Sequence, residues 1–372
     1  MRQTRATWGV RPPIVKELHL KAIQSFILYG VETWYSDLVK LNSKLTQIQR
    51  IPLQVIAKNY RTVSTDVLTG CPPLDLVARA KSLKYDLIYR DKQITLNDMI
   101  LFRDQFDLPY KQFHPPWLLI SIPRSLDLDP NKSVPKIFTD GSKLNERVGR
   151  GIVCYDENNK ESWSSLYRLS DNTSVFIAEA TAILFAIKKV CHLTQEIIIL
   201  TDSRSVLMAL EAIKDQTTLI NDIQDSLRDH PNILMGWVKA HVGIGGNERA
   251  DSLEKEATTR SQIDINVKYS KTWLKNSLNK FIVNNWQLRW ENSRNARYTF
   301  GLFPEVSLDR CYGDFFLNQF LTGHGVFSIH QSKFYGKSDQ CNCGLDKGTI
   351  THYLFGCPNF GHIRREFFPN NF

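Results

Sequence analysis

The spacing of apolar residues changes along the chain and divides it into regions of different expected structure. Up to about residue 130, apolar side chains recur at steps of three and four, which is typical of helices packed on one face. Three such stripes are Val15, Leu18, Ala22 and Phe26; Leu38, Leu41, Leu45 and Ile48; and Leu76, Ala80, Leu83 and Leu87. The Gly70-Cys71-Pro72-Pro73 segment interrupts the chain before the third stripe. A mainly helical region is therefore expected, with its lysines and arginines outward.

Between residues 136 and 260 the pattern predicts an α/β fold. The expected strands are 136–140, 149–155, 161–167, 196–201 and 232–238, and the expected helices are 174–191, 203–214, 217–229 and 246–259. Short connections join the first three strands, so these should pair as antiparallel hairpins. The later strands alternate with helices, which favours parallel pairing. The prediction is a mixed sheet with flanking helices, preceded and followed by mainly helical regions.

The rest of the chain has less regular patterns. Residues 106–134 contain or border six prolines with little periodicity, and are interpreted as a linker. In residues 261–335, the aromatic side chains of Trp273, Phe281, Trp286 and Trp290 are interspersed with lysines and arginines. These aromatics either stack on nucleic-acid bases or form the buried face of an amphipathic helix. The expected division is 1–105, 106–134, 135–260, 261–335 and 336–372.

Size and charge narrow the class of protein. A chain of 372 residues suggests two or three domains, and the net charge of +9 with a pI near 9.1 favours a polyanionic partner such as nucleic acid. The seven cysteines are an odd number, bunched towards the end, which does not indicate a disulfide framework. The chain has no apolar run of about 18–20 residues and no signal peptide. We therefore expect a soluble, intracellular protein, in the nucleus or cytoplasm.

Four acidic residues carry the clearest chemical signal. Asp140 and Asp202 end apolar runs, where a buried strand should emerge from the sheet, whereas Glu179 and Asp251 lie on expected helices. Carboxylates cost several kcal/mol to bury unless something pairs with them, so a cluster of them usually indicates bound divalent cations. Two such cations about 4 Å apart stabilise both the attacking and the leaving oxygen of a phosphodiester cleavage. The pattern therefore predicts a metal-dependent nuclease.

The neighbours of these acids fit the same chemistry. Gly141 would let a phosphate approach the backbone, and Ser142 and Lys143 place hydrogen-bond donors beside it. His241 lies between glycines in Lys-Ala-His-Val-Gly-Ile-Gly-Gly, a setting for a mobile loop that moves a proton or releases product. Each acid alone could be merely a cap, a turn residue or a surface charge. The prediction depends on finding all of them together.

The complete set of motifs resembles ribonuclease H. The motifs are Thr-Asp-Gly-Ser, Ala-Glu, Thr-Asp-Ser and His-x-Gly-x-x-Gly-Asn-Glu-x-Ala-Asp, within residues 136–260, and they are most similar to the domain of Jockey- and I-like non-LTR retrotransposons. The resemblance implies that Asp140, Glu179, Asp202 and Asp251 are the metal-binding carboxylates. It also implies that His241 is the catalytic histidine of the flexible loop.

The activity that this resemblance implies is hydrolysis of the RNA strand of an RNA–DNA hybrid, with two Mg²⁺ or Mn²⁺ ions. Selecting RNA requires contacts to the 2′-hydroxyl, and Gly141, Ser142, Asn145 and Ser174 lie where the substrate could be bound. Segments such as 27–34 and 70–74 resemble the region after a reverse-transcriptase core. No Tyr-x-Asp-Asp motif occurs, so no polymerase activity is expected, and the chain is interpreted as the C-terminal piece of a larger protein. The missing polymerase core is an expected partner.

The C-terminal tail contains four residues with soft ligand atoms. Cys341, Cys343, His352 and Cys357 fall within a short segment, and three thiolates with one imidazole suit tetrahedral zinc. The Cys-x-Cys spacing is tighter than the usual Cys-x-x-Cys. A small helical hairpin with idle thiols is the alternative, and His324, His330 and His362 are further candidate ligands nearby.

Two other functions remain open at this stage. The first is a DNA-cutting transposase or integrase of the same fold, which the histidine loop and the Asn247-Glu248-x-Ala-Asp251 segment argue against. The second is a catalytically idle nucleic-acid-binding remnant of a retrotransposon. The intact acidic residues argue against long decay.

Overall fold

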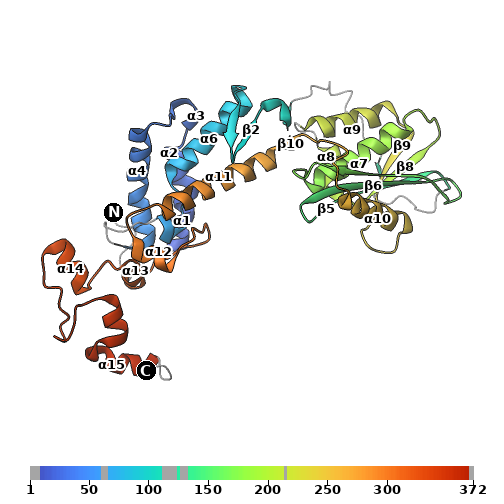
Figure 1. Cartoon of the computed structure of the whole chain (residues 1–372). Coiled ribbons are helices and arrows are strands. Elements are labelled where there is room, and N and C mark those ends of the chain that lie inside the picture. Colours follow the sequence, from blue (N-terminus) through green and yellow to red (C-terminus); the bar gives the residue numbers. More distant parts are fainter. Residues whose placement is uncertain (1–8, 60–65, 111–123, 126–132, 213–215, 368–372) are drawn as a thin grey trace. The chain divides into compact units, whose positions relative to one another are not determined.

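The computed structural model describes residues 9–59, 66–110, 124–125, 133–212 and 216–367, and its chain forms two compact units. One unit combines Met1–Ile100 with Ser277–Phe372, and the other is Leu101–Asn276. Figure 1 labels many of the elements named below. Most of the linker expected at 106–134 lies outside the described residues, because 111–123 and 126–132 are not among them.

The second unit is built on a six-stranded mixed sheet. The strand order is β4-β9-β8-β5-β6-β7. In this order the strands are β4 (Arg124–Ser125), β9 (Ile233–Trp237), β8 (Ile197–Thr201), β5 (Lys136–Leu144), β6 (Arg147–Tyr155) and β7 (Glu161–Leu169). Strands β5, β6 and β7 pair antiparallel, while β5–β8, β8–β9 and β4–β9 are parallel. The pattern of hairpins followed by parallel strands is therefore confirmed, with the predicted strand positions shifted or extended by a few residues.

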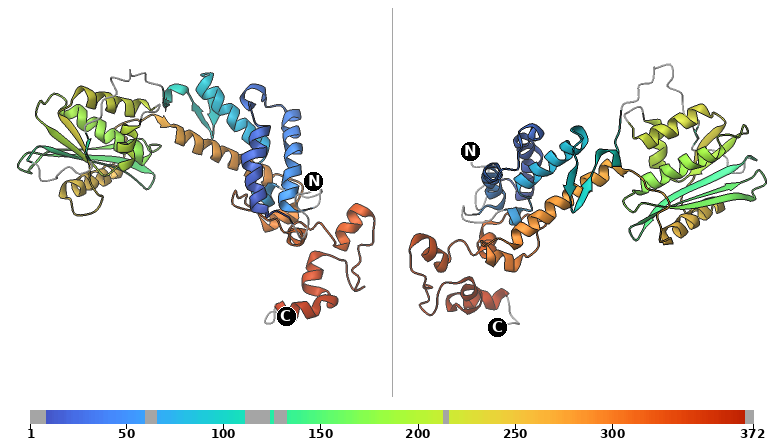
Figure 2. Two further views of the ribbon diagram at one scale, coloured as in Figure 1. Left: turned by 180° about the vertical axis from the view of Figure 1, so that it is seen from behind. Right: turned by 45° about the horizontal axis from the view of Figure 1, so that its top comes forward.

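Helices cover both faces of this sheet because successive strand residues point to opposite sides. Ile137, Ile199 and Met235 pack under α7 (Val175–Val190), α8 (Arg204–Glu211) and α9 (Thr218–Asp229). Phe138, Ile198 and Leu200 pack against α10 (Gly245–Thr259) on the other side. Figures 1 and 2 show α7–α9 on one face and α10 on the other. The predicted fold class is correct.

This unit extends beyond the expected boundaries of 135–260. A short parallel pair joins β3 (Phe106–Asp107) to β10 (Tyr269–Ser270). The Asp107 carboxylate accepts hydrogen bonds from the backbone N–H groups of Thr218 (2.8 Å) and Leu219 (3.3 Å), at the start of α9. On the other side, Asp264 accepts a 2.7 Å hydrogen bond from the Arg168 backbone N–H. The segments before and after the expected domain are therefore parts of its structure.

The first unit is mainly helical. Its N-terminal part contains α1 (Pro12–Leu18), the π-helix η1 (His19–Ile23), α2 (Gln24–Ile27), α3 (Val31–Trp34), α4 (Val39–Ala57), α5 (Asp66–Thr69) and α6 (Leu74–Tyr89). A two-stranded sheet of β1 (Ile94–Leu96) and β2 (Met99–Leu101) follows. The C-terminal elements are α11 (Lys271–Glu291), α12 (Arg297–Leu302), α13 (Phe315–Thr322), α14 (Ser328–Tyr335), η4 (His352–Gly356), η5 (Pro358–Phe360) and α15 (Gly361–Phe367).

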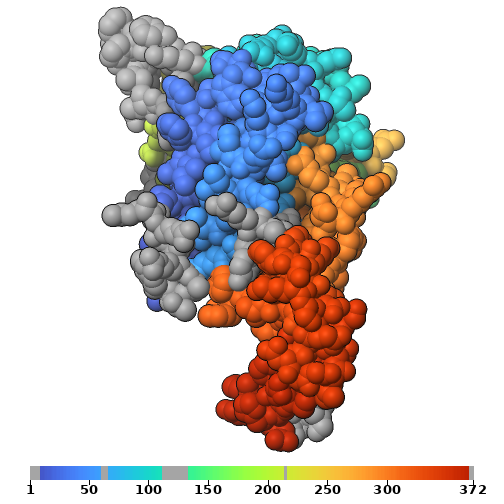
Figure 3. Space-filling view, turned by 90° about the vertical axis from the view of Figure 1, so that its left-hand side faces the viewer, coloured from blue at the N-terminus to red at the C-terminus, as the bar shows by residue number. Residues whose placement is uncertain are grey.

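The first two helical stripes expected from the sequence are only partly correct. Leu45 is buried, but Leu18, Phe26 and Leu38 are exposed, and Leu28 is buried instead. The π-helical turn η1 changes the helical periodicity, and the chain leaves the helix before Gly30, whose φ of +59° is left-handed, so a single periodicity does not run through this segment. Figure 3 shows the outer face of these N-terminal helices in blue.

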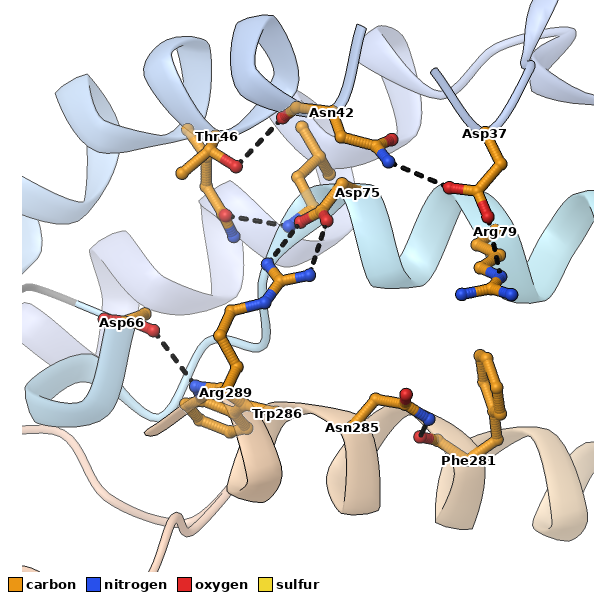
Figure 4. A network of polar contacts seen from close by, with 12 residues as sticks. Asp37, Asn42, Thr46, Asp66, Asp75, Arg79, Phe281, Asn285, Trp286 and Arg289 are labelled. Atoms are coloured by element: carbon orange, nitrogen blue, oxygen red, sulfur yellow. Dashed lines mark hydrogen bonds and ion pairs between the residues drawn. The ribbon is translucent and has the colours of Figure 1, made fainter. Parts of the chain in front are cut away.

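Helix α11 packs against α6 through Trp286 and Trp290, which decides between the two interpretations for this part of the basic-aromatic segment. Trp286 is 1% exposed and lies in one cluster with Trp290, Leu76 and Val67. Its indole N–H donates to Asp66 at 3.0 Å, and both terminal nitrogens of Arg289 donate to the Asp75 carboxylate, at 3.0 and 2.7 Å (Figure 4). These aromatic side chains form a protein core and do not offer faces for base stacking.

These contacts also explain why the structure groups the chain differently from the five expected segments. The helices before residue 100 and those after residue 277 share a hydrophobic cluster, so they belong to one unit.

Among the described residues, no helix has both the length and the apolar character needed to cross a membrane.

Candidate active site

The structure brings the four predicted acids together, in two groups that share one residue. Asp140 lies within β5, Glu179 within α7, Asp202 directly after β8, and Asp251 within α10. Ligand oxygens of Asp140, Glu179 and Asp202 all lie within 4.8 Å of one another. Those of Asp140 and Asp251 form a second group with the same spread, completed by Glu254. Asp140 is thus the common member.

Glycines on the strands let the two helices come close enough to form these groups. A Cβ on Gly141 would lie 2.6 Å from the backbone nitrogen of Glu179. On the opposite face, a Cβ on Gly151 would lie 2.2 Å from the Ala250 carbonyl oxygen, and one on Gly149 would lie 2.3 Å from the Glu254 carbonyl oxygen. Any larger residue at these positions would push α7 or α10, with their carboxylates, away from the sheet.

Asp140 and Glu179 are buried, and burial changes their ionisation. Asp140 is 7% exposed and Glu179 is 5% exposed. Burial, together with the charges of Asp202 and Glu254, raises the pKa of Asp140 to about 7. Burial and the charge of Asp140 raise the pKa of Glu179 well above its ordinary value. One carboxylate oxygen of Glu179, Oε2, is buried without a hydrogen-bond partner in the described part of the chain.

Hydrogen bonds hold the carboxylates of Asp140, Asp202 and Asp251 in position. The Gly141 backbone N–H donates to Asp140 at 2.7 Å, and the Asn247 side-chain amide donates to Asp202 at 3.2 Å. The Lys255 ammonium donates to Asp251 at 2.6 Å. These partners leave other carboxylate oxygens free to act as ligands, and carboxylate oxygens are the ligands that Mg²⁺ and Mn²⁺ prefer. The donor set therefore fits hard divalent cations.

His241 lies outside both carboxylate groups. It is exposed in the segment between β9 and α10, with a left-handed φ of +52°. Gly243, two residues on, has a φ of +84° and open space around it. An exposed histidine on such a segment can reach a bound substrate without contacting the acids directly.

The predicted substrate-binding residues have more varied settings. The position where Gly141 lacks a Cβ faces α7, so its missing side chain allows close helix packing, and its contact with substrate stays a prediction. The Ser142 hydroxyl donates a short hydrogen bond to Glu254, and the Ser174 hydroxyl accepts from the Ile177 N–H at 3.4 Å as the N-cap of α7. Asn145 is exposed at the β5–β6 turn, with a φ of +49°.

Glu254 is the carboxylate that the sequence prediction missed. It is 1% exposed and lies one helical turn after Asp251, so both face the sheet from α10. Burial raises its pKa, against the effect of the Ser142 hydrogen bond. The available signal was its i+3 spacing from Asp251. The charged sequence Glu254-Lys255-Glu256, however, is typical of a solvent-exposed helix face.

The C-terminal tail brings its four predicted ligands together. Cys341, Cys343, His352 and Cys357 place one ligand atom each within 4.8 Å of all the others. The Cys343 sulfur lies 3.2 Å from His352 Nε2, and the sulfurs of Cys341 and Cys357 are 3.6 Å apart. His352 Nδ1 lies 3.7 Å from an Asp346 carboxylate oxygen, which favours Nε2 as the ligand atom. His324, His330 and His362 are not part of this group.

Comparisons with known proteins agree with this site. The RNase H family model matches residues 132–259, which include both carboxylate groups. A retrovirus-related Pol polyprotein from the type-1 retrotransposable element R1 of Popillia japonica is 26% identical over 208 residues, 54% of this chain and 83% of that protein. The chain thus contains a ribonuclease H domain and is similar to proteins of non-LTR retrotransposons. The Jockey- and I-like subgroup stays a prediction, since the matched relatives are described as R1 elements.

A second relative is far longer than the matched region. The putative 115 kDa protein in the type-1 retrotransposable element R1DM of Drosophila melanogaster is 33% identical over 116 residues. The match covers 30% of this chain but only 11% of that protein. The activities and partners of such a whole protein are therefore matters for proposal.

Solved structures with similar folds include a viral protease-reverse transcriptase and an RNase H1. A foamy viral protease-reverse transcriptase in complex with double-stranded DNA is 22% identical with a TM-score of 0.32, covering 36% of this chain and 98% of that one. LC11-RNase H1 in complex with an RNA/DNA hybrid is 21% identical with a TM-score of 0.29, covering 33% and 96%. These scores are low, and the site described above does not depend on them.

Proposed function

We propose that residues 135–260 hydrolyse the RNA strand of RNA–DNA hybrids as a metal-dependent endonuclease. The observation that carries the proposal is the pair of carboxylate groups sharing Asp140, on an RNase H domain. The buried, unpaired Oε2 of Glu179 supports it, because a buried carboxylate oxygen without a donor is costly unless a cation neutralises it. The positive charge of the chain is consistent with a nucleic-acid partner.

Two Mg²⁺ or Mn²⁺ ions, when bound, would activate a water and stabilise charge on the scissile phosphate. Asp140, Glu179 and Asp202 would hold one ion, and Asp140 and Asp251 would hold the other. Asn247 keeps the Asp202 carboxylate in place through its 3.2 Å hydrogen bond. Cleavage would leave a 3′-hydroxyl and a 5′-phosphate. His241, on its exposed segment, would move a proton or assist product release.

Substrate selection is proposed to depend on the turn between β5 and β6. Asn145 is exposed there and has a side-chain amide that can donate to or accept from a 2′-hydroxyl. Ser142 and Ser174 remain proposed contacts, although their hydroxyls already have partners within the protein. A reverse-transcriptase core as partner, and a site of action in the nucleus or cytoplasm, also remain proposals.

The substrate class is tested by offering the protein three duplexes of one sequence in Mg²⁺. These are an RNA–DNA hybrid, double-stranded RNA and double-stranded DNA, each with one labelled strand at a time. We expect cleavage of the hybrid's RNA strand alone. Cleavage of DNA would favour the transposase-like alternative, and binding of the hybrid without any cleavage would favour an idle binding remnant.

For the tail, we propose a zinc ion held by Cys341, Cys343, His352 and Cys357. Three thiolates and an imidazole are the ligand set of structural zinc sites. The turn that carries the first two cysteines supports this arrangement. Gly344 has a φ of +75°, and its N–H donates to the Cys341 carbonyl at 2.9 Å, so the chain folds back between the ligands.

The zinc proposal is tested by measuring the metal content of protein purified with zinc. We expect about one zinc per chain, because a closed four-ligand site holds a single ion. The Cys343→Ser variant should lose it, whereas Cys191→Ser, a cysteine outside the cluster, should retain it. Wild-type protein without zinc, or a Cys343→Ser variant with full zinc content, would contradict the proposal.

A further inference from the structure

Glu254 is placed among the catalytic acids by the packing of α10. Because Gly149 and Gly151 have no side chains, the backbone of α10 lies directly on β6 at Ala250 and Glu254. The Glu254 side chain is therefore confined between helix and sheet, and is 1% exposed. It extends to Ser142 on β5, two residues after Asp140, and accepts a hydrogen bond from that hydroxyl.

The Ser142 hydroxyl is the one hydrogen-bond partner found for this carboxylate among the described residues. A single neutral donor does not offset the cost of burying a charged carboxylate. The ligand oxygens nearest to it belong to Asp140 and Asp251, all three within 4.8 Å of one another. Three carboxylates this close repel one another unless a cation lies between them.

Charge counting points to the same conclusion. The two groups contain five carboxylates, which are Asp140, Glu179, Asp202, Asp251 and Glu254. Lys255, bonded to Asp251, provides one positive charge. Two divalent cations would supply the remaining four, so the site would be neutral with two ions bound. A buried carboxylate oxygen on the other side of Asp140, Oε2 of Glu179, independently lacks a protein donor among the residues described.

We propose that Glu254 is a fifth metal-binding carboxylate, which holds the second divalent ion together with Asp140 and Asp251. The inference rests on the proposed function, because it assigns a ligand to one of the two ions of that site. Ser142 then acts as a positioning residue, since its hydroxyl fixes one oxygen of Glu254 and leaves the other for the metal. The consequence is tighter binding of the second ion than Asp140 and Asp251 alone would give.

The test counts Mn²⁺ ions bound by the full chain without nucleic acid, by calorimetric titration and by electron paramagnetic resonance. The variant Glu254→Gln keeps the size of the side chain and can still accept from Ser142, but it removes the charge. Glu256→Gln is the matched control, because Glu256 is exposed on the same helix and lies outside both groups. Thermal unfolding in a chelator confirms that each variant is folded.

Two Mn²⁺ ions are expected in the wild type and in Glu256→Gln. In Glu254→Gln the tighter ion should bind as before, through Asp140, Glu179 and Asp202, and the weaker one should lose about tenfold to a hundredfold in affinity. Its unfolding temperature in chelator should rise, because one repulsive charge is removed. The Mg²⁺ concentration needed for half-maximal hybrid cleavage should increase.

Other results separate the possible failures. If Glu254→Gln binds both ions like the wild type and is less stable in chelator, Glu254 is a structural hydrogen-bond acceptor and this inference is overturned. If the wild type binds two ions but cuts no hybrid, the proposed function fails while the ligand assignment still stands on the binding data. Wild-type protein that binds no Mn²⁺ would overturn both.

Discussion

At the scale of single residues, Asp140 is the carboxylate that the two groups share, and its context in the sequence was sufficient to find it. Asp140 ends an apolar run of the sequence and precedes a glycine, which is typical of a ligand-binding group on a buried strand. Glu254 could not be found in the same way, because its sequence neighbours Lys255 and Glu256 are exposed. Its burial follows from glycines on another strand, about a hundred residues earlier in the chain.

The ionisation of Asp140 predicts how the stability of the metal-free protein depends on pH. Its pKa is about 7 in the folded protein against 3.8 ordinarily, so the folded state binds the proton more tightly than the unfolded state. The free energy of unfolding should therefore fall as pH rises from about 4 to about 7, and this contribution should be constant above that range. Chelator-treated wild type and Asp140→Asn are compared by denaturant unfolding at several pH values.

In Asp140→Asn this part of the pH slope should disappear. Added Mg²⁺ should stabilise the wild type more at pH 8 than at pH 5, because the cation competes with protons for the same oxygens. Identical pH slopes for the two proteins would show that Asp140 does not titrate in this range.

At the scale of elements, the strands and helices of residues 136–260 follow closely from the sequence, since alternation and helical periodicity there are regular. What the sequence did not show is how near the helices come to the sheet. The strand expected at 149–155 includes Gly149 and Gly151 without showing what they do, whereas the structure uses them for the contact of β6 with α10. The N-terminal stripes were harder to interpret, because short helices and a π-helical turn interrupt them.

The contact of α10 with β6 predicts the effect of adding one methyl group. In Gly151→Ala, the new Cβ would meet the Ala250 carbonyl oxygen at 2.2 Å, so α10 must shift outward. We expect a loss of about 1–3 kcal/mol in the free energy of unfolding, as for other overpacked cores. Affinity for the second Mn²⁺ ion should fall as well, because Asp251 moves with the helix.

The matched control for this prediction is Gly245→Ala. Gly245 starts the same helix and has open space around its Cα, so its stability and Mn²⁺ affinity should stay close to wild type. If Gly151→Ala behaves like Gly245→Ala, the helix does not depend on this close contact.

At the scale of the whole molecule, the chain forms two units, and one of them is assembled from both ends of the sequence. The sequence pattern predicted separate helical segments before and after the α/β region. No local pattern shows that residues as far apart in the chain as Asp75 and Arg289 form an ion pair. From the sequence, the tryptophans of α11 could either stack on nucleic-acid bases or be buried in a protein core. Only the position of α6 and α5 beside them decides for the core.

The unit built from both ends should depend strongly on Trp286. Truncating this buried side chain to alanine should cost about 3–5 kcal/mol of that unit's stability, because it leaves a cavity and removes the indole donor to Asp66. Trp34→Ala, at a half-exposed tryptophan of the same unit, should cost much less. Calorimetric unfolding with and without Mg²⁺ measures both. Equal losses in the two variants would contradict the proposed core.

A metal centre held by the carboxylates around Asp140 is proposed to cut the RNA strand of a hybrid. The most direct test is the single-turnover rate of hybrid cleavage by Asp140→Asn beside that of the wild type. Asp229→Asn, at an exposed aspartate of the same unit, is the control for the amide substitution. Several kcal/mol of metal-mediated stabilisation are lost with a shared ligand, and each 1.4 kcal/mol is about tenfold, so a loss of roughly 10³-fold is expected. Wild-type and Asp229→Asn rates should agree. Undiminished Mg²⁺-dependent cleavage by Asp140→Asn would contradict the account.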